Sequence, residues 1–253
     1  MYCSLSLILT NNNVFRMKLF KKFGLFLFWI MLLLDCGLTI INNQEYRIYT
    51  KPFLIPVLAL YFYLNTKRSR HYTTKTWVYL SLLFSWASEL LFLKNDSMPK
   101  FQGDIFLQVG ILMLILTFLI YAMMFVKMNK LDIKDCQEAF ISTLLLSIVG
   151  LIFFKFFKSE KVENSFKYLV VVCLITTSLV MGLAANIYKN KVRKNMAYQY
   201  FIPGFFIITL SVYIVLTHRF LLHDAEFLPP VIVLTYRFGQ MLILRGFAKY
   251  LKA

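Results

Sequence analysis

The sequence has few charged residues, and acidic residues are its scarcest charges. Only 16% of the 253 residues are charged, whereas a water-soluble domain usually carries about 25%. Apolar residues make up 59% of the chain and the mean hydropathy is +0.66. This composition excludes an ordinary soluble domain and predicts an integral membrane protein.

Cysteine and histidine are also scarce, with four Cys and three His. The cysteines have no CxxC spacing and no neighbouring His, so they indicate neither a zinc site nor a disulfide framework. The spacing of His218, His223 and Asp224 matches no recognised metal-binding pattern. We therefore expect no metal site and no cofactor.

Long apolar runs separated by short polar segments dominate the chain. Each is in or near the range of about 17 to 25 residues that a membrane-spanning helix needs. They cover residues 23–41, 49–64, 76–93, 105–126, 139–154, 168–188, 197–216 and 227–244. The second and fifth runs are short and leave the count open by about one helix. The sequence predicts an all-α integral membrane bundle of about eight transmembrane helices.

The basic residues indicate how this bundle is oriented. If the amino terminus is cytoplasmic, 18 Lys and Arg lie on the cytoplasmic side and nine on the opposite side. This asymmetry predicts that both termini are cytoplasmic, in the inner membrane if the source is bacterial. Bases spread over several loops of one membrane face would meet anionic lipid headgroups. We therefore expect membrane lipids as partners and no nucleic acid, and the sequence does not specify an oligomeric state.

The two ends of the chain flank the predicted transmembrane domain, residues 23–245. Residues 1–22 form a cytoplasmic tail in which Met17 is a second plausible start beside Met1. The apolar run that follows has no small-residue cleavage site, which favours a retained signal anchor. Residues 246–253 form a short basic cytoplasmic tail.

Three ionisable side chains stand out within the predicted spans: Asp35, Glu89 and Arg237. Each costs about 2.5 kcal/mol or more at the bilayer centre unless it is sheltered, so such residues are candidates for function. Asp35 lies near the end of its span, where simple contact with headgroup water is at least as good an interpretation.

Glu89 is supported by a polar stripe on an otherwise apolar helix. The stripe consists of Ser81, Ser85, Ser88 and Glu89, at positions i, i+4, i+7 and i+8. The last span carries a matching patch of Tyr236, Arg237 and Gln240, and the seventh carries Tyr200, Gly204 and Ser211. One stripe alone would indicate interhelical hydrogen bonds. Three stripes with a carboxylate and a guanidinium favour a cavity, and Lys51 at the outer start of the second span could hold an anionic headgroup there.

Several segments in this order resemble the YhhN-type membrane proteins, a family that includes the lysoplasmalogenases. They are Lys51-Pro52 before a Leu-rich helix, the stretch from Leu83 to Leu91 around Glu89, the helix ending at Tyr121, the stretch from Gly204 to Ser211, and the closing stretch from Tyr236 to Arg245. The closing stretch is the most specific match. The resemblance covers most of the chain from the second span onward.

This resemblance implies a hydrolase that cleaves the vinyl-ether bond of lysoplasmalogens to a fatty aldehyde and a glycerophospho-headgroup. Two acidic residues form the family's acid/base pair; the first corresponds to Glu89, but Val212 occupies the position of the second. Phe118 stands where the family usually has a His. The expected catalytic residues are therefore Glu89 as acid and, as our own hypothesis, Asp35 as base.

The expected substrate is a lysophospholipid or similar amphiphile. Its binding residues are expected to be Lys51, Ser85, Ser211, Tyr236, Arg237 and Gln240. The incomplete acidic pair leaves open a second interpretation, a catalytically silent family member that binds or moves such an amphiphile. An ion-coupled transporter is less favoured because the two halves show no obvious internal repeat.

Overall fold

The computed structural model describes nearly all of the predicted transmembrane domain. It describes residues 23–41, 43–67, 69–97, 100–129, 141, 144, 145, 148, 152, 164–186, 194–220, 225 and 227–252. Within these ranges the chain is helical and contains no strand, as the composition predicted. The predicted tail 1–22, with its two possible starts, lies outside the described residues.

The first described helix, Phe23–Ile40, is followed by a series of mostly long helices. They are α2 (Gln44–Thr66), α3 (Tyr72–Ser97), α4 (Lys100–Asn129), α6 (Asn164–Asn186), the short α7 (Lys194–Met196), the π-helical segment η3 (Ala197–Phe201), α8 (Ile202–Phe220) and α9 (Leu228–Tyr250). The predicted basic tail 246–253 is largely the last turn of α9. The π-helical segment lies just before Pro203, whose ring nitrogen cannot donate the usual helical hydrogen bond.

Five described helices, not eight, are long and apolar enough to cross a membrane. They are Phe23–Ile40, Tyr72–Lys94, Ile105–Met128, Ala197–Val215 and Leu228–Tyr250. The predicted span 49–64 lies in α2, where polar residues flank a short apolar centre. The predicted span 168–188 lies in α6, whose apolar part Val171–Ala184 is shorter. Most of the predicted span 139–154 lies outside the described residues.

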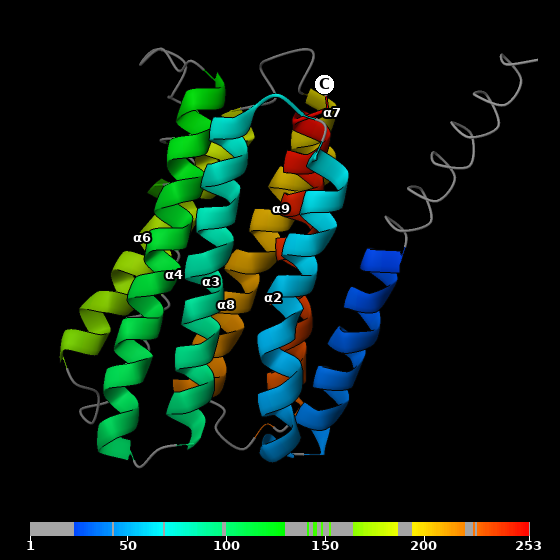
Figure 1. Ribbon diagram of the computed structural model, residues 1–253. Coiled ribbons are helices and arrows are strands. Elements are labelled where there is room, and N and C mark those ends of the chain that lie inside the picture. Colours follow the sequence, from blue (N-terminus) through cyan, green and yellow to red (C-terminus); the bar gives the residue numbers. More distant parts are fainter. Residues whose placement is uncertain are drawn as a thin grey trace, which may run out of the picture.

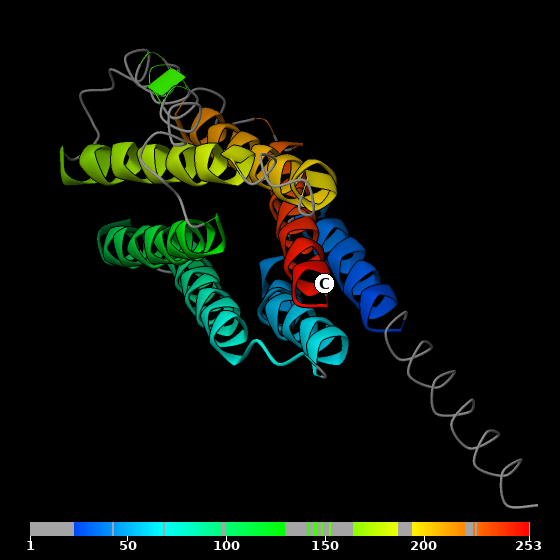
Figure 2. The same cartoon turned by 90° about the horizontal axis from the view of Figure 1, so that it is seen from above.

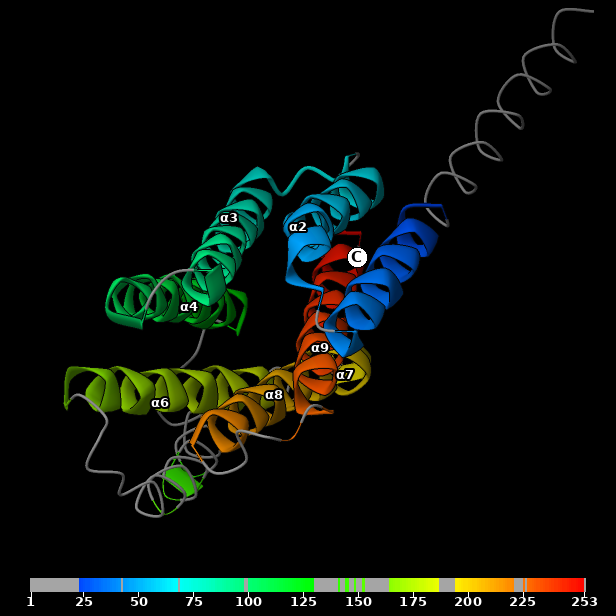
Figure 3. The ribbon, with the colours of Figure 1, turned by 90° about the horizontal axis from the view of Figure 1, so that it is seen from below.

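Six helices form a closed ring in the order α2, α3, α4, α6, α8 and α9, each packed against the next (Figures 2 and 3). The helix Phe23–Ile40 lies outside the ring, beside α2 and α9. It meets α9 where the Trp29 ring packs against Phe238, with centroids 5.9 Å apart. The helix Phe23–Ile40 runs away from the end of the bundle that carries the carboxyl terminus (Figure 1).

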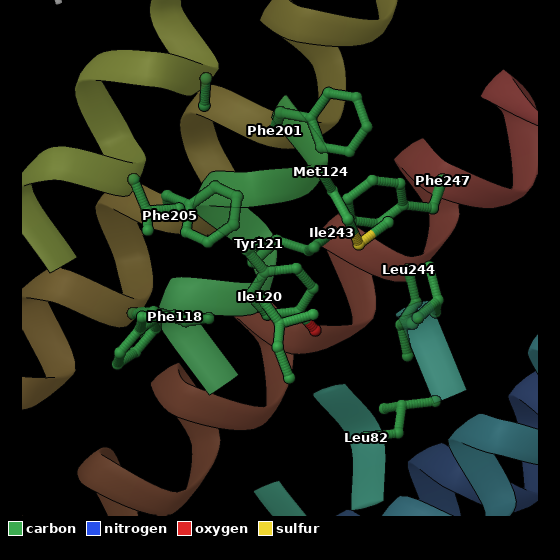
Figure 4. Packing of buried hydrophobic residues seen from close by; sticks show 14 of the residues in the cluster. Leu82, Phe118, Ile120, Tyr121, Met124, Phe201, Phe205, Ile243, Leu244 and Phe247 are labelled. Carbon is green, nitrogen blue, oxygen red and sulfur yellow. The ribbon is translucent and has the colours of Figure 1, made fainter. Parts of the chain in front are cut away.

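The core at this end consists mainly of aromatic rings that project inward from α4, η3, α8 and α9. We call Tyr121, Phe125, Phe201, Phe205 and Phe247 the aromatic cluster. All of them except Phe125 are labelled in Figure 4. Phe125 stacks on Phe247 at 5.7 Å and meets Phe201 edge-on at 5.2 Å. Such arrangements stabilise aromatic pairs beyond simple burial. The cluster therefore holds four segments together at the end that carries the carboxyl terminus.

Two glycines allow α8 and α9 to approach closely. A Cβ atom on Gly239 would lie 2.7 Å from the carbonyl oxygen of Gly204, and one on Gly204 would lie 3.1 Å from that of Gly239. Neither backbone can accept a side chain without moving. Small residues at membrane helix crossings commonly have this role. The crossing fixes α9 beside the ring interior and thereby positions Arg237 and Gln240.

Candidate functional site

Glu89 of α3 lies beside two cations from two other helices. Its Oε2 atom is 3.0 Å from Nη2 of Arg237 on α9 and 3.7 Å from Nζ of Lys51 on α2. Arg237 is 2% exposed and Glu89 is 9% exposed. One carboxylate therefore faces two positive charges in a buried setting, which leaves the group with an excess positive charge.

A chain of hydrogen bonds extends this group toward the polar stripe of α3. Nη1 of Arg237 donates to Oε1 of Gln240 at 2.9 Å, and Nε2 of Gln240 donates to Oγ of Ser85 at 2.6 Å. The Ser85 hydroxyl is also 3.4 Å from the hydroxyl of Tyr236. We call Lys51, Ser85, Glu89, Tyr236, Arg237 and Gln240 the Glu89 cluster. The two stripes that the sequence indicated thus meet face to face.

The start of α2 is held against α3 by an indole. Nε1 of Trp86 donates to the backbone oxygen of Pro52 at 2.8 Å. Pro52 removes one backbone donor but keeps its carbonyl, and this carbonyl is the acceptor here. The contact places Lys51, the preceding residue, within reach of Glu89.

Asp35 lies in a separate polar group, which we call the Asp35 cluster: Asp35, Arg47 and Thr50. The Thr50 hydroxyl donates to Oδ1 of Asp35 at 2.9 Å, and Nε of Arg47 lies 3.7 Å from the same oxygen. Asp35 is 0% exposed, so its carboxylate is inside the protein. Its ion-pair and hydrogen-bond partners are thus on α2, whereas those of Glu89 are on α2 and α9.

The remaining sequence candidates lie elsewhere. Ser211 donates to the backbone oxygen of Ile232 at 3.2 Å, which joins α8 to α9. Val212 is half-buried, and Phe118 is buried on α4 near the aromatic cluster (Figure 4). The structure thus joins five of the predicted binding residues to Glu89 and gives Ser211 and Asp35 other partners.

Sequence reasoning missed Arg47 and Thr50 as partners of Asp35. Residues 44–48 read as a polar loop, but Asn43 accepts a hydrogen bond from the backbone of Tyr46 and α2 begins at Gln44. Asn is a common N-cap residue, so Asn43 was the signal that could have placed the start of this helix at residue 44 instead of residue 49. With this extension, Arg47 and Lys51 are at i and i+4 on one face of α2.

Four buried side-chain atoms in the described part of the chain make no hydrogen bond, and all lie in or beside these two clusters. They are Oδ2 of Asp35, Nε of Arg47, Oγ of Ser88 and Nη2 of Arg237. Nη2 of Arg237 is near Glu89, but its N–H groups do not point along a hydrogen bond. Buried polar atoms usually have partners, so such a concentration is typical of a site that binds a polar ligand or water.

A family model described as the YhhN family matches residues 46–247. The chain belongs to the YhhN family. This confirms the resemblance inferred from the motifs, and the matched segment contains the whole Glu89 cluster. Asp35 and the helix Phe23–Ile40 precede the matched segment. Comparisons with curated proteins and with solved structures gave no match.

Membership of the YhhN family and the five apolar helices together establish a helical membrane protein. Among the described residues, no group of three or more His, Cys, Asp or Glu side chains could hold a metal ion. The chemistry available at the Glu89 cluster is that of one carboxylate, two cations, an amide and two hydroxyls.

Proposed function

We propose that this YhhN-family protein is a membrane hydrolase that cleaves the vinyl-ether bond of lysoplasmalogens. The observation that carries the proposal is the buried Glu89 carboxylate beside Lys51 and Arg237. The two cations fit the phosphate of a lysophospholipid, and the carboxylate fits the chemistry of the vinyl ether. The apolar walls of the surrounding helices suit the hydrocarbon chain.

In this proposal one carboxyl group serves as both acid and base. The incoming phosphate competes with Glu89 for the two cations, so Glu89 can take up a proton. Glu89 then protonates the β-carbon of the vinyl ether, and its carboxylate stabilises the oxocarbenium ion that forms. Water attacks this ion and gives its proton to Glu89. Glu89 then gives this proton to the glycerol oxygen and takes the hydroxyl proton of the hemiacetal as the carbon–oxygen bond breaks, which releases the fatty aldehyde and the glycerophospho-headgroup.

The test is aldehyde release by the purified full-length protein in lipid nanodiscs. We expect release from lysoplasmalogens with an ethanolamine or a choline headgroup, and none from the saturated-ether analogues, which lack the vinyl bond. Glu89→Gln should abolish release, whereas Glu45→Gln, an exposed carboxylate on α2, should leave it unchanged. No release from either headgroup, or full activity in Glu89→Gln, would overturn the proposal.

A catalytically silent lipid-binding protein is the second candidate. It is favoured by Val212 and Phe118, which replace the acid and the His expected from the resemblance, and by the distinct partners of Asp35 and Glu89. Such a protein would retain a lysoplasmalogen intact, with equal retention by the wild type and Glu89→Gln. Progressive conversion of the bound lipid to aldehyde would exclude this function.

We also propose that the chain crosses the membrane eight times, with both termini in the cytoplasm. α4 and α6 both run toward the end of the bundle that carries the carboxyl terminus (Figure 1), so the end of α4 and the start of α6 lie toward opposite ends, as an odd number of crossings between them requires. The basic asymmetry supports a cytoplasmic location for the end that carries the carboxyl terminus. A carboxyl-terminal reporter active only outside the cytoplasm should stay silent, and its activity would contradict this topology.

A further inference from the structure

We propose that the Asp35 cluster and the Glu89 cluster together bind a zwitterionic phospholipid headgroup with a primary ammonium, and that they select ethanolamine over choline. This inference rests on the proposed lysophospholipid substrate and names its headgroup. In it, Asp35 is a binding residue for the ammonium and not a second catalytic carboxylate.

The chemical character of the four buried atoms that make no hydrogen bond matches such a headgroup. Nε of Arg47 and Nη2 of Arg237 are donors, and each can donate to a phosphate oxygen. Oδ2 of Asp35 is an acceptor, and it requires a donor from the ligand. Oγ of Ser88 can donate or accept. A phosphate supplies the acceptors and an ammonium supplies the donor, so one ligand satisfies both kinds of atom.

The spacing along α2 also fits. Arg47 and Lys51 are separated by about one helical turn, about 5.4 Å along the axis. Arg47 lies beside Asp35, and Lys51 lies beside Glu89. In phosphoethanolamine, one oxygen and two carbons separate phosphorus from nitrogen, a reach comparable with one such turn. A phosphate near Lys51 and Arg237 can therefore direct its ammonium toward Asp35.

The Asp35 cluster lies near one end of the bundle, where a lipid headgroup would contact the protein. Asp35 is in the last two turns of its helix, and Arg47 and Thr50 are in the first two turns of α2. The end of the helix Phe23–Ile40 and the start of α2 both lie at the end of the bundle opposite the carboxyl terminus (Figure 1). A lipid whose headgroup lies here has its hydrocarbon chain along the apolar helices.

Hydrogen bonding gives the reason for selectivity. A primary ammonium has three N–H donors, one of which can satisfy Oδ2 of Asp35. The trimethylammonium of choline has none, so its binding would leave this buried oxygen unpaired. Loss of a hydrogen bond to a charged group therefore corresponds to a difference in affinity of about tenfold or more.

The test measures the affinity of the full-length protein in nanodiscs for saturated-ether lysophospholipids, which cannot be cleaved at a vinyl bond. The probes carry ethanolamine, its N-methyl, N,N-dimethyl and N,N,N-trimethyl forms, or a bare phosphate. We expect the ethanolamine probe to bind about tenfold more tightly than the trimethyl and bare-phosphate probes, with the largest loss at the third methyl group. Equal affinity for these probes in the wild type would overturn the inference.

Variants separate this role from a purely structural one. Asp35→Asn should remove the preference for ethanolamine and leave the choline probe bound with wild-type affinity, which also checks that the variant is folded. Glu45→Gln, an exposed carboxylate on α2 outside both clusters, is the control and should keep the preference for ethanolamine. Preference retained in Asp35→Asn would overturn the inference. Because binding is read without turnover, ethanolamine preference without aldehyde release would overturn only the proposed hydrolase.

Discussion

The two ends of the bundle use the same helices in opposite ways. Near the carboxyl terminus, α9 contributes Phe247 to the aromatic cluster, where no described buried side-chain atom lacks a hydrogen bond. Toward its other end, the same helix contributes Arg237 and Gln240 to the Glu89 cluster, and all four buried atoms that lack a hydrogen bond in the described part lie in or beside this cluster and the Asp35 cluster. At the apolar end, the packed rings stabilise the bundle. At the polar end, buried side-chain atoms make no hydrogen bond within the protein, and a ligand can supply these bonds.

The largest expected effect comes from removing one charge at the polar end. Arg237→Met leaves the Glu89 carboxylate buried with only Lys51, and loss of one partner of a buried ion pair costs about 3–5 kcal/mol. The same variant should abolish lysophospholipid binding. The double variant Glu89→Met/Arg237→Met should recover most of the free energy of unfolding but not the binding. Denaturant titration in lipid measures the first quantity, and additive losses in the double variant would contradict the coupling.

At the apolar end, truncation should cost stability without altering function. Phe247→Ala removes a ring that contacts Tyr121, Phe125 and Phe201, and such truncations cost about 3 kcal/mol or more. Lipid affinity per folded molecule should remain that of the wild type. A parallel loss of affinity in the folded fraction would show that the two ends are coupled.

The glycine crossing connects the two ends and should give a smaller effect. Gly239→Ala places a methyl group against the carbonyl of Gly204, and overpacking of this kind costs about 1–3 kcal/mol. Because α9 must shift, the contact between Arg237 and Glu89 should also weaken, and lipid affinity should fall. The hydroxyl of half-buried Thr235 donates to the backbone of its own helix, α9, so Thr235→Ala is a control that should change neither quantity appreciably. Unchanged thermal stability of Gly239→Ala would contradict the close approach.

The smallest effect is expected at the outer part of the hydrogen-bond chain. Ser85→Ala removes the acceptor for Gln240, with a cost of about 1–2 kcal/mol. Lipid affinity should decrease only modestly because Glu89, Lys51 and Arg237 remain. A loss as large as that of Arg237→Met would mean that Ser85 contacts the ligand itself.

At the polar end, the sequence predicted which side chains are functional candidates better than it predicted which of them contact one another. Period-3.6 spacing identified the polar stripe with Ser85 and Glu89 and the patch with Arg237 and Gln240. Ionisable residues within apolar helices pair mainly with one another, which favoured a contact between the stripe and the patch. Periodicity does not encode which helices are neighbours. For this reason Asp35 was expected to act with Glu89, whereas the structure gives it Arg47 and Thr50 as partners.

The number of predicted spans shows a related limit of reasoning from hydropathy. Apolar run length located the helices, but α2 begins at Gln44, in a segment too polar to recognise as part of a span. The start of α2 is nevertheless where Arg47, Thr50 and Lys51 meet two buried carboxylates. The residues that weaken the hydropathy signal are thus the ones that carry the proposed site.

The most direct test of the account is the affinity of the Glu89→Met/Arg237→Met double variant for a saturated-ether lysophospholipid with an ethanolamine headgroup. The account predicts a folded protein of near wild-type stability that no longer binds the probe, because Arg237, one of the two cations proposed to hold the phosphate, is absent. Wild-type affinity in the folded double variant would contradict the claim that the Glu89 cluster is a headgroup-binding site.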